Sequence, residues 1–181
     1  MDMQRSSAAT AVAALGLLLR SSHGEAPTKV GQLSVWHEVV SLGDTAGSVE
    51  KKFLADPSLP GFIAHAGGKV VGVLSRRALL TAISQPFGRE VFIKRSLHEL
   101  AQHLDSKPLT LEANTTIAAA LRLAMGRRDE LRFEPCLVKT GQDVGLLEMH
   151  VLMLAQANLL EEAMTSKDTL IAKIKMILGD N

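Results

Sequence analysis

Two stretches of this chain carry the same order of secondary-structure signals, and this duplication constrains the fold more than any other sequence feature. Each stretch has a short strand, a tight glycine-containing turn, a second strand with a central glycine, and a helical run. In the first stretch these segments are residues 61–66, 67–68, 69–75 and 76–83. In the second stretch they are residues 134–139, 140–143, 144–148 and 149 onward. Such a repeat predicts two similar units packed together.

An amphipathic helix precedes each stretch, at Ser48–Leu54 and at Thr116–Met125. The complete pattern predicts an α/β fold of two β-α-β-β-α repeats with pseudo-twofold symmetry, plus an N-terminal helix and a long C-terminal helix. In this fold Gly72 and Gly145 occupy equivalent positions. The apolar strand residues expected in the core are Ile63, Val71, Val73, Leu137, Leu146 and Leu147.

Three segments carry a resemblance to a known family. Residues 68–76 read GKVVGVLSR, and residues 40–45 (VSLGDT) and 109–115 (LTLEANT) look like the strand-to-helix entries that open each copy. With these segments the chain resembles a tandem pair of CBS domains (a Bateman module), regulatory modules that often bind adenosine nucleotides. The resemblance runs from Val30 to Gln156. Residues 85–97 are similar to a segment between CBS copies in bacterial signalling proteins.

The repeat and the breaker residues around it divide the chain into five parts. These are an N-terminal helix and linker (1–29), a first CBS repeat (30–84), an inter-repeat segment (85–107), a second CBS repeat (108–158) and a C-terminal amphipathic helix (159–181).

Composition argues against several classes of partner. The 181 residues are 46% hydrophobic and 22% charged, which is typical of a globular chain, and the net charge of +1 gives no attraction to nucleic acid or to an anionic membrane. Aromatic residues make up only 3%, so surfaces for stacking bases are scarce. We therefore expect a cytoplasmic protein with no nucleic-acid partner and no membrane partner. Cys136 is the single cysteine, which excludes an internal disulfide and is typical of a buried, inert thiol.

The N-terminal apolar run allows two interpretations. Residues 8–19 (AATAVAALGLLL) carry no charge, follow Arg5 and precede Gly24-Glu25-Ala26, as in a secretory signal with a small-x-small cleavage site. The alternative is an Ala/Leu-rich helix that packs against the rest of the fold, and Asp2 favours this alternative.

The last segment, from Met149 to Leu178, consists of helix-forming residues without Pro or Gly. Apolar residues recur every three or four positions, with Lys167 as the one interruption; they are Leu160, Met164, Ile171, Ile174 and Leu178. This stripe predicts a homodimer, and such a helix commonly passes a signal to an output domain or protein.

The resemblance implies a nucleotide site between the two copies. In the family a Ser or Thr after the last strand contacts phosphate, and an Asp three residues later holds the ribose hydroxyls. Ser75 takes the first role here, and Arg76 and Arg77 add cations beside it, while Ala78 stands at the Asp position. Ser75, Arg76 and Arg77 are therefore the candidate ligand-binding residues. Alternatively, Ser75 only caps the following helix and the two arginines are solvated surface residues.

The second copy departs further from the family pattern. Glu148 stands at the hydroxyl position and Val151 at the Asp position. A carboxylate at Glu148 would repel a phosphate, so this second site is expected to be disabled for nucleotide.

No other chemistry emerges from the sequence. His98 and His103 are five residues apart, a spacing that does not suit metal on one helix face, and no phosphate-loop or nucleophile motif occurs. We expect no enzyme activity, no metal and no required cofactor, with an adenosine nucleotide as the candidate ligand. The sequence predicts a regulatory module that signals through a dimeric C-terminal helix; the alternative is a structural dimerisation module with a decayed ligand cleft.

Overall fold

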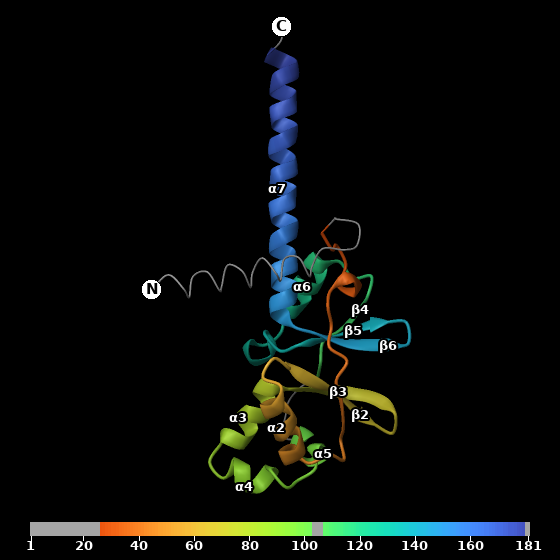
Figure 1. Ribbon diagram of the computed structural model, residues 1–181, viewed down its shortest axis with the longest axis vertical. Helices are drawn as coiled ribbons and strands as arrows, with labels where there is room; N and C mark the ends of the chain where they lie inside the picture. The colour runs from red at the N-terminus through yellow and green to blue at the C-terminus, as the bar shows by residue number, and fades with distance from the viewer. Residues whose placement is uncertain (1–25, 103–106, 180–181) are drawn as a thin grey trace.

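The computed structural model describes residues 26–102 and 107–179, and it confirms the predicted α/β fold with two repeats. The first half contains β1 (Val39–Ser41), α2 (Ala46–Ala55), β2 (Gly61–Ala66), β3 (Lys69–Ser75) and α3 (Arg76–Ser84). The second half contains β4 (Thr110–Glu112), α6 (Ile117–Met125), β5 (Cys136–Thr140), β6 (Asp143–Leu147) and α7 (Met149–Gly179). The two halves lie one above the other, and α7 extends away from them (Figure 1).

Each half builds one three-stranded sheet with the same topology. The strand orders are β1-β2-β3 and β4-β5-β6, and in both sheets the first pair is parallel and the second antiparallel. Gly72 pairs with Ala64, which pairs with Val40 on the edge strand. Gly145 pairs with Val138, which pairs with Leu111. The two glycines therefore occupy equivalent rows, as the repeat predicts.

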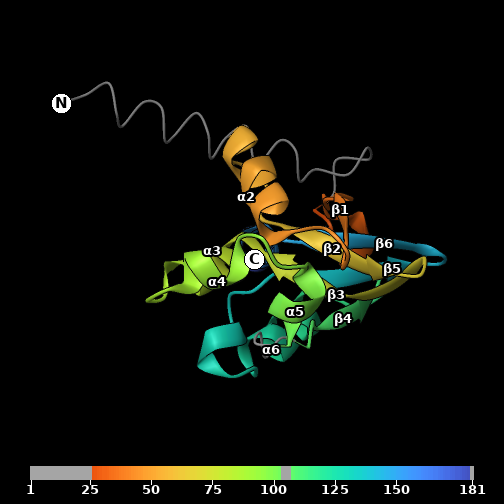
Figure 2. The same ribbon diagram turned by 90° about the horizontal axis from the view of Figure 1, so that it is seen from below.

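The hairpin turns depend on glycine. Gly67, Gly68 and Gly141 have φ of 56°, 76° and 65°, in the left-handed region where a Cβ is unfavourable. Both hairpin turns lie on the same side of the molecule (Figure 2). The helices begin with hydroxyl caps in both halves, since Thr45 accepts a hydrogen bond from the Ser48 N–H and Thr116 accepts one from the Ala119 N–H.

The prediction of burial is wrong for one of the six core residues. Val71 is 50% exposed, because the register of the first hairpin shifts: Gly72 pairs with Ala64 and Val70 with His65, which leaves Val71 without a partner across the hairpin. Val73 is half-buried. The other four predicted core residues are buried, as expected: Ile63, Leu137, Leu146 and Leu147.

The buried residues form a core in each half and a smaller cluster between them. The large side chains of the first core include Phe53, Phe62 and Leu79, and those of the second include Ile117 and Leu152. The third cluster joins the two sheets through Ile63, Leu137 and Leu146. Ile63 and Leu137 hold equivalent positions in the two sheets, so the repeat itself supplies the contact between the halves.

Segments outside the repeats complete the two cores. The short 3-10 helix η1 (Val30–Gln32) belongs to the second half, where Val30 and Leu33 are buried, although the predicted first repeat begins at residue 30. In the predicted inter-repeat segment, α4 (Gly88–Phe92) and α5 (Leu97–Ala101) pack on the first half, and Leu97 and Leu100 lie in its core.

The predicted second repeat and C-terminal helix are continuous in the structure, because α7 runs without a break from Met149 to Gly179. The predicted N-terminal helix, and with it the choice between a packed helix and a signal segment, concerns residues 8–19 and lies outside the described residues.

Candidate ligand-binding cleft

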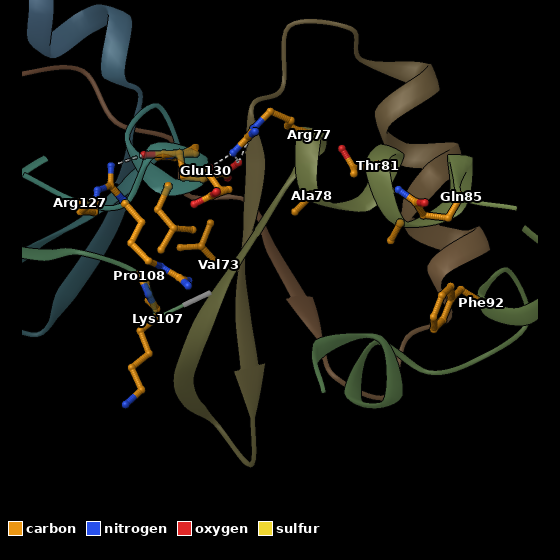
Figure 3. Close-up of a pocket in the computed structure, with 15 residues that line it drawn as sticks. Val73, Arg77, Ala78, Thr81, Gln85, Phe92, Lys107, Pro108, Arg127 and Glu130 are labelled. Carbon is orange, nitrogen blue, oxygen red and sulfur yellow. Dashed lines mark hydrogen bonds and ion pairs between the residues drawn. The ribbon is translucent and has the colours of Figure 1, made fainter. Parts of the chain in front are cut away.

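A cleft with a volume of about 640 Å³ lies between the two halves. Its first wall comes from the end of β3 and one face of α3. Ala78, Thr81 and Gln85 line this wall at a spacing of three and four residues, which places them on the same helix face (Figure 3). Phe92 of α4 closes the far end of the wall.

The second wall comes from the other half. Lys107 and Pro108 lead into β4, and Arg127, Arg128, Glu130 and Leu131 lie on and around the 3-10 helix η2 (Asp129–Leu131), just before Glu134 and Pro135 at the start of β5. Among the described lining residues four are basic, namely Arg77, Lys107, Arg127 and Arg128, and two are acidic, namely Glu130 and Glu134. The cleft therefore combines a helix face of mixed polar and apolar side chains with an excess of positive charge.

An ion pair joins the two walls. The Arg77 Nε donates a hydrogen bond to the Glu134 Oε1 at 2.7 Å, and the Arg77 Nη2 lies 2.6 Å from the same oxygen. The Arg77 Nη2 also donates to the Glu130 carbonyl (Figure 3). The Glu134 side chain is only 14% exposed, so it is shielded from water more than an ordinary surface carboxylate. Arg77 thus holds a carboxylate of the opposite half at the cleft.

Arg127, which lines the cleft, also contacts the backbone of the second wall. Its Nη2 donates to the Glu134 carbonyl at 2.7 Å and lies 3.5 Å from the Cys136 Sγ. Burial raises the pKa of the Cys136 thiol, and the nearby Arg127 guanidinium opposes that shift. Because the raised pKa keeps the thiol protonated and Cys136 is buried, the expectation of an inert thiol agrees with this environment.

The three predicted ligand residues have different surroundings. Ser75 is 3% exposed, and its Oγ accepts a hydrogen bond from the Ala78 N–H, which makes it the N-cap of α3. Arg76 donates to the carbonyls of Phe53, Leu59 and Asp56 at 2.5–2.9 Å. Its guanidinium also lies over the Phe53 ring, 4.6 Å from the centroid.

Arg77 is the predicted residue that lines the large cleft. All three predicted residues border a smaller neighbouring hollow of about 390 Å³, together with Glu148 and His150 of the second half. The structure therefore brings Ser75, Arg76 and Arg77 to the boundary between the halves, but it commits Ser75 and Arg76 to contacts within the first half.

At the corresponding place in the second half, Glu148 contacts protein side chains. The Trp36 Nε1 donates to the Glu148 Oε1 at 2.8 Å, and the His150 Nδ1 lies 3.2 Å from the Glu148 Oε2. The backbone of Trp36 also pairs with Leu146, with N–O distances of 2.7 and 2.9 Å. Trp36 therefore contacts the end of β6, next to Glu148, the residue that stands where the family has a Ser or Thr.

Solved structures with the same architecture identify the fold. A CBS-domain containing protein from Agrobacterium tumefaciens aligns with a TM-score of 0.56 and 18% sequence identity, over 71% of this chain and 93% of that one. The chain has the fold of a tandem CBS pair. CBSX2, a CBS-pair protein from Arabidopsis thaliana, aligns in its complex with AMP with a TM-score of 0.54 and 18% identity, over 74% of this chain and 98% of that one.

A third CBS structure, the cytosolic domain of the Mg²⁺ channel MgtE in complex with ATP, aligns with a TM-score of 0.51 and 17% identity. That alignment covers 70% of this chain and 48% of the channel chain. No protein-family model matches the sequence, and a search of curated proteins finds no match.

Sequence reasoning missed the second wall of the cleft. The candidates were taken from the positions directly after each second strand, because the CBS resemblance assigns ligand contacts to those positions. Lys107, Arg127 and Arg128 lie elsewhere in the sequence and were therefore left out. The adjacent basic pair Arg127-Arg128, just after the predicted helix Thr116–Met125, was the available signal. Within residues 26–102 and 107–179, no helix is long and apolar enough to span a membrane, and no group of three metal-ligating side chains occurs.

Proposed function

We propose that this chain is a non-catalytic regulatory module that binds an adenosine nucleotide, or a small ligand of similar chemistry, in the cleft between its two halves. The observation that supports the proposal is the cleft itself, which combines basic side chains from both halves with apolar side chains such as Val73, Ala82 and Phe92. Its volume is within the range of about 300–1,000 Å³ that is usual for small-ligand sites. The neighbours CBSX2 and MgtE, solved with AMP and ATP, support the choice of ligand.

The chemistry of a nucleotide suits the two kinds of surface. Arg77, Arg127 and Arg128 supply the positive charge that a phosphate requires, and guanidinium groups can bind phosphate oxygens in pairs. Ala78, Ala82 and Phe92 offer apolar surface to a purine base. Thr81 supplies a hydroxyl on the same helix face, but the carboxylate expected for the ribose hydroxyls is absent because Ala78 stands at that position.

Binding would change the contact between the halves. A phosphate that bound Arg77 would compete with the Glu134 carboxylate, which holds the same guanidinium in the free protein. Exchange of one anion for the other would release the ion pair between the two walls. A ligand that binds more tightly to the arrangement without this ion pair would increase the population of that arrangement. We infer that this population shift is the regulatory output of the module.

Titration calorimetry with adenine and guanine nucleotides on the whole chain tests this proposal. We expect adenine nucleotides to bind with micromolar affinity and with little discrimination between ribose and deoxyribose. Replacing Ala78 by Asp should strengthen binding of the ribose form by about tenfold, because the carboxylate can accept hydrogen bonds from the two ribose hydroxyls.

Arg122→Asp is the matched control for that variant, since Arg122 is exposed on α6 and does not line the cleft. If no nucleotide binds to either the original chain or Ala78→Asp, the cleft is not a nucleotide site.

The exposed apolar residues of α7 favour a second function, that of a structural dimerisation module with a decayed cleft. Leu160, Met164 and Ile174 are 57%, 67% and 46% exposed on the part of α7 that leaves the halves. A chain that forms a stable homodimer and binds no nucleotide would support this second function. A chain that does both would fit a regulator whose dimeric helix passes the signal to an output domain or protein.

A further inference from the structure

The distal part of α7, residues 160–178, projects from the second half. Near the start of the helix Leu152 and Ala155 are buried in the second core, and Leu159 packs against that core. Every residue from Leu160 to Leu178 is exposed, and this part of the helix extends beyond the two halves (Figure 1). Many of these exposed side chains are apolar, which indicates a surface that another segment covers.

One side of the distal helix continues the side that faces the second core. Because eighteen residues make about five turns of an α-helix, Leu170 points in the same direction as the buried Leu152. Leu170 and Ile177 are nevertheless 58% and 74% exposed. Five residues lie within about 40° of Leu170 around the helix axis and form the core-side face of distal α7. They are Ala163, Ser166, Leu170, Ile174 and Ile177.

The first described residues are anchored beside the start of α6. Pro27 is buried, and the Ile117 N–H donates a hydrogen bond to the Thr28 carbonyl at 3.0 Å. The Val30 N–H donates to the Thr115 carbonyl at 3.0 Å. Any segment formed by residues 1–25 is therefore tethered to the second half at the start of α6.

The start of α6 lies toward the distal part of α7. The other end of α6 is next to the start of α7, since the Arg127 Nη2 lies 3.8 Å from the Met149 Sδ. The two helices pack on each other, and the nine residues of α6 rise about 13 Å, as far as the first nine residues of α7. The described chain therefore begins close to the level at which α7 leaves the second half (Figure 1).

We propose that residues 8–19 form a helix that packs on the core-side face of distal α7 and runs antiparallel to it. As a helix, these residues would be about 18 Å long, against about 27 Å for residues 160–178. Residues 20–25 can span up to about 20 Å between this helix and the anchored segment. A short link of this kind favours antiparallel neighbours, whereas a parallel arrangement would need the link to return almost fully extended.

The sequence of residues 8–19 suits a packed position. The segment carries no charge, and helix geometry places Val12, Leu15 and Leu19 within about 60° of one another on one side, with Ala8 between them. Leu18 lies at the edge of this side, and Leu17 is the one large apolar residue that faces away. The segment therefore has a single apolar side for the core-side face of α7.

The sizes of the side chains also favour the antiparallel orientation. In that orientation Leu15 and Leu19 lie near the second half, where the core-side face has the small residues Ala163 and Ser166. Further out, Ala8 lies beside the larger side chain of Leu170 or its neighbours. Large side chains thus meet small ones along the pair, as close packing requires. A parallel orientation would place large against large at one end and small against small at the other.

This contact leaves part of the apolar surface of α7 uncovered. Leu160, Met164 and Ile171 lie about 80–120° from Leu170 around the helix, beside the core-side face. The self-association proposed above would use these residues, so the two contacts do not compete.

Hydrogen exchange of the full chain, followed by mass spectrometry, tests the proposal. A 12-residue helix is marginal on its own in water, so slow exchange of the amides of residues 8–19 requires packing. We expect these amides to exchange at least about tenfold more slowly than in an unstructured chain. The slowing should be the same at about 0.1 and 10 µM protein, because an intramolecular contact does not depend on concentration.

A charge on the core-side face should release the segment. Leu170→Asp should return the exchange of residues 8–19 to the unstructured rate, because the contact would bury an unpaired carboxylate. Ala172→Asp is the matched control, since Ala172 is exposed and lies about 160° from Leu170 around the helix. The control should keep the exchange of residues 8–19 within about twofold of the original.

Three results would overturn the proposal. The first is fast exchange of residues 8–19 in the original chain, or equal protection in the original chain and in Leu170→Asp. The second is protection that appears only at concentrations where sedimentation equilibrium shows a dimer, which would mean that a second copy covers this face. The third is an intact mass that lacks residues 1–26, which would assign the apolar run to a secretory signal.

Discussion

Arg76 and Arg77 are neighbours in sequence with opposite surroundings. The Arg76 side chain turns into the first half, where it hydrogen-bonds three backbone carbonyls that follow or end α2 and packs over Phe53. The Arg77 side chain points across the boundary to Glu134. From the sequence, both arginines were predicted to bind a ligand. The sequence after a strand does not show which backbone carbonyls lie within reach of each side chain.

This difference predicts different consequences for stability. Arg76→Ala should lower the free energy of unfolding by about 3 kcal/mol, since three carbonyls lose a charged donor and Phe53 loses its packing partner. Arg122→Ala, at an exposed position on α6, should change it by less than about 0.5 kcal/mol. Urea denaturation followed by circular dichroism measures both. Equal, small effects would show that the Arg76 contacts contribute little to folding.

The positions of the strands and helices were predicted better than their packing and strand register. Turn glycines and amphipathic runs are local signals, and they located both hairpins and the helices before and after them. The packing of α5 on the first half was not predicted, because it depends on long-range contacts such as the Leu97 N–H donating to the Asp44 carbonyl. The bulge at Val71 was missed for the same reason, since only the partner strand reveals a shift of register.

Gly72 and Gly145 hold equivalent positions in the two sheets but have different neighbours. Substitution by alanine should therefore change stability by different amounts at the two positions. A Cβ at Gly145 would lie 2.4 Å from the Val35 Cγ2, whereas a Cβ at Gly72 would meet no atom within 4 Å. Gly145→Ala should therefore lower the free energy of unfolding by about 2 kcal/mol. Gly72→Ala should leave it unchanged or raise it by about 0.5 kcal/mol. Thermal or urea unfolding of the two variants side by side checks this, and equal losses would contradict the asymmetry.

Three kinds of contact between described residues join the two halves of the molecule. The apolar cluster around Ile63, Leu137 and Leu146 joins the sheets, and the strand-like pairing of Trp36 with Leu146 carries the chain across from the second half to the first. The third contact is the ion pair between Arg77 and Glu134, for which the proposed anionic ligand would compete. The sequence predicted a site between the halves through the CBS resemblance. It did not predict this ion pair, because residues 57 positions apart meet only in the folded molecule.

Titration calorimetry of AMP against the original chain and Glu134→Gln tests whether a nucleotide displaces the contact between the halves. Glu112→Gln is the matched control, because Glu112 is an exposed carboxylate outside the cleft. The competition between phosphate and Glu134 predicts that Glu134→Gln binds AMP about tenfold more tightly than the original chain, because the amide keeps the shape of the side chain but removes the competing charge. Glu112→Gln should bind as the original chain does. An unchanged or weakened affinity in Glu134→Gln, or no binding of AMP to any of the three proteins, would contradict the proposal that a nucleotide displaces the contact between the two halves.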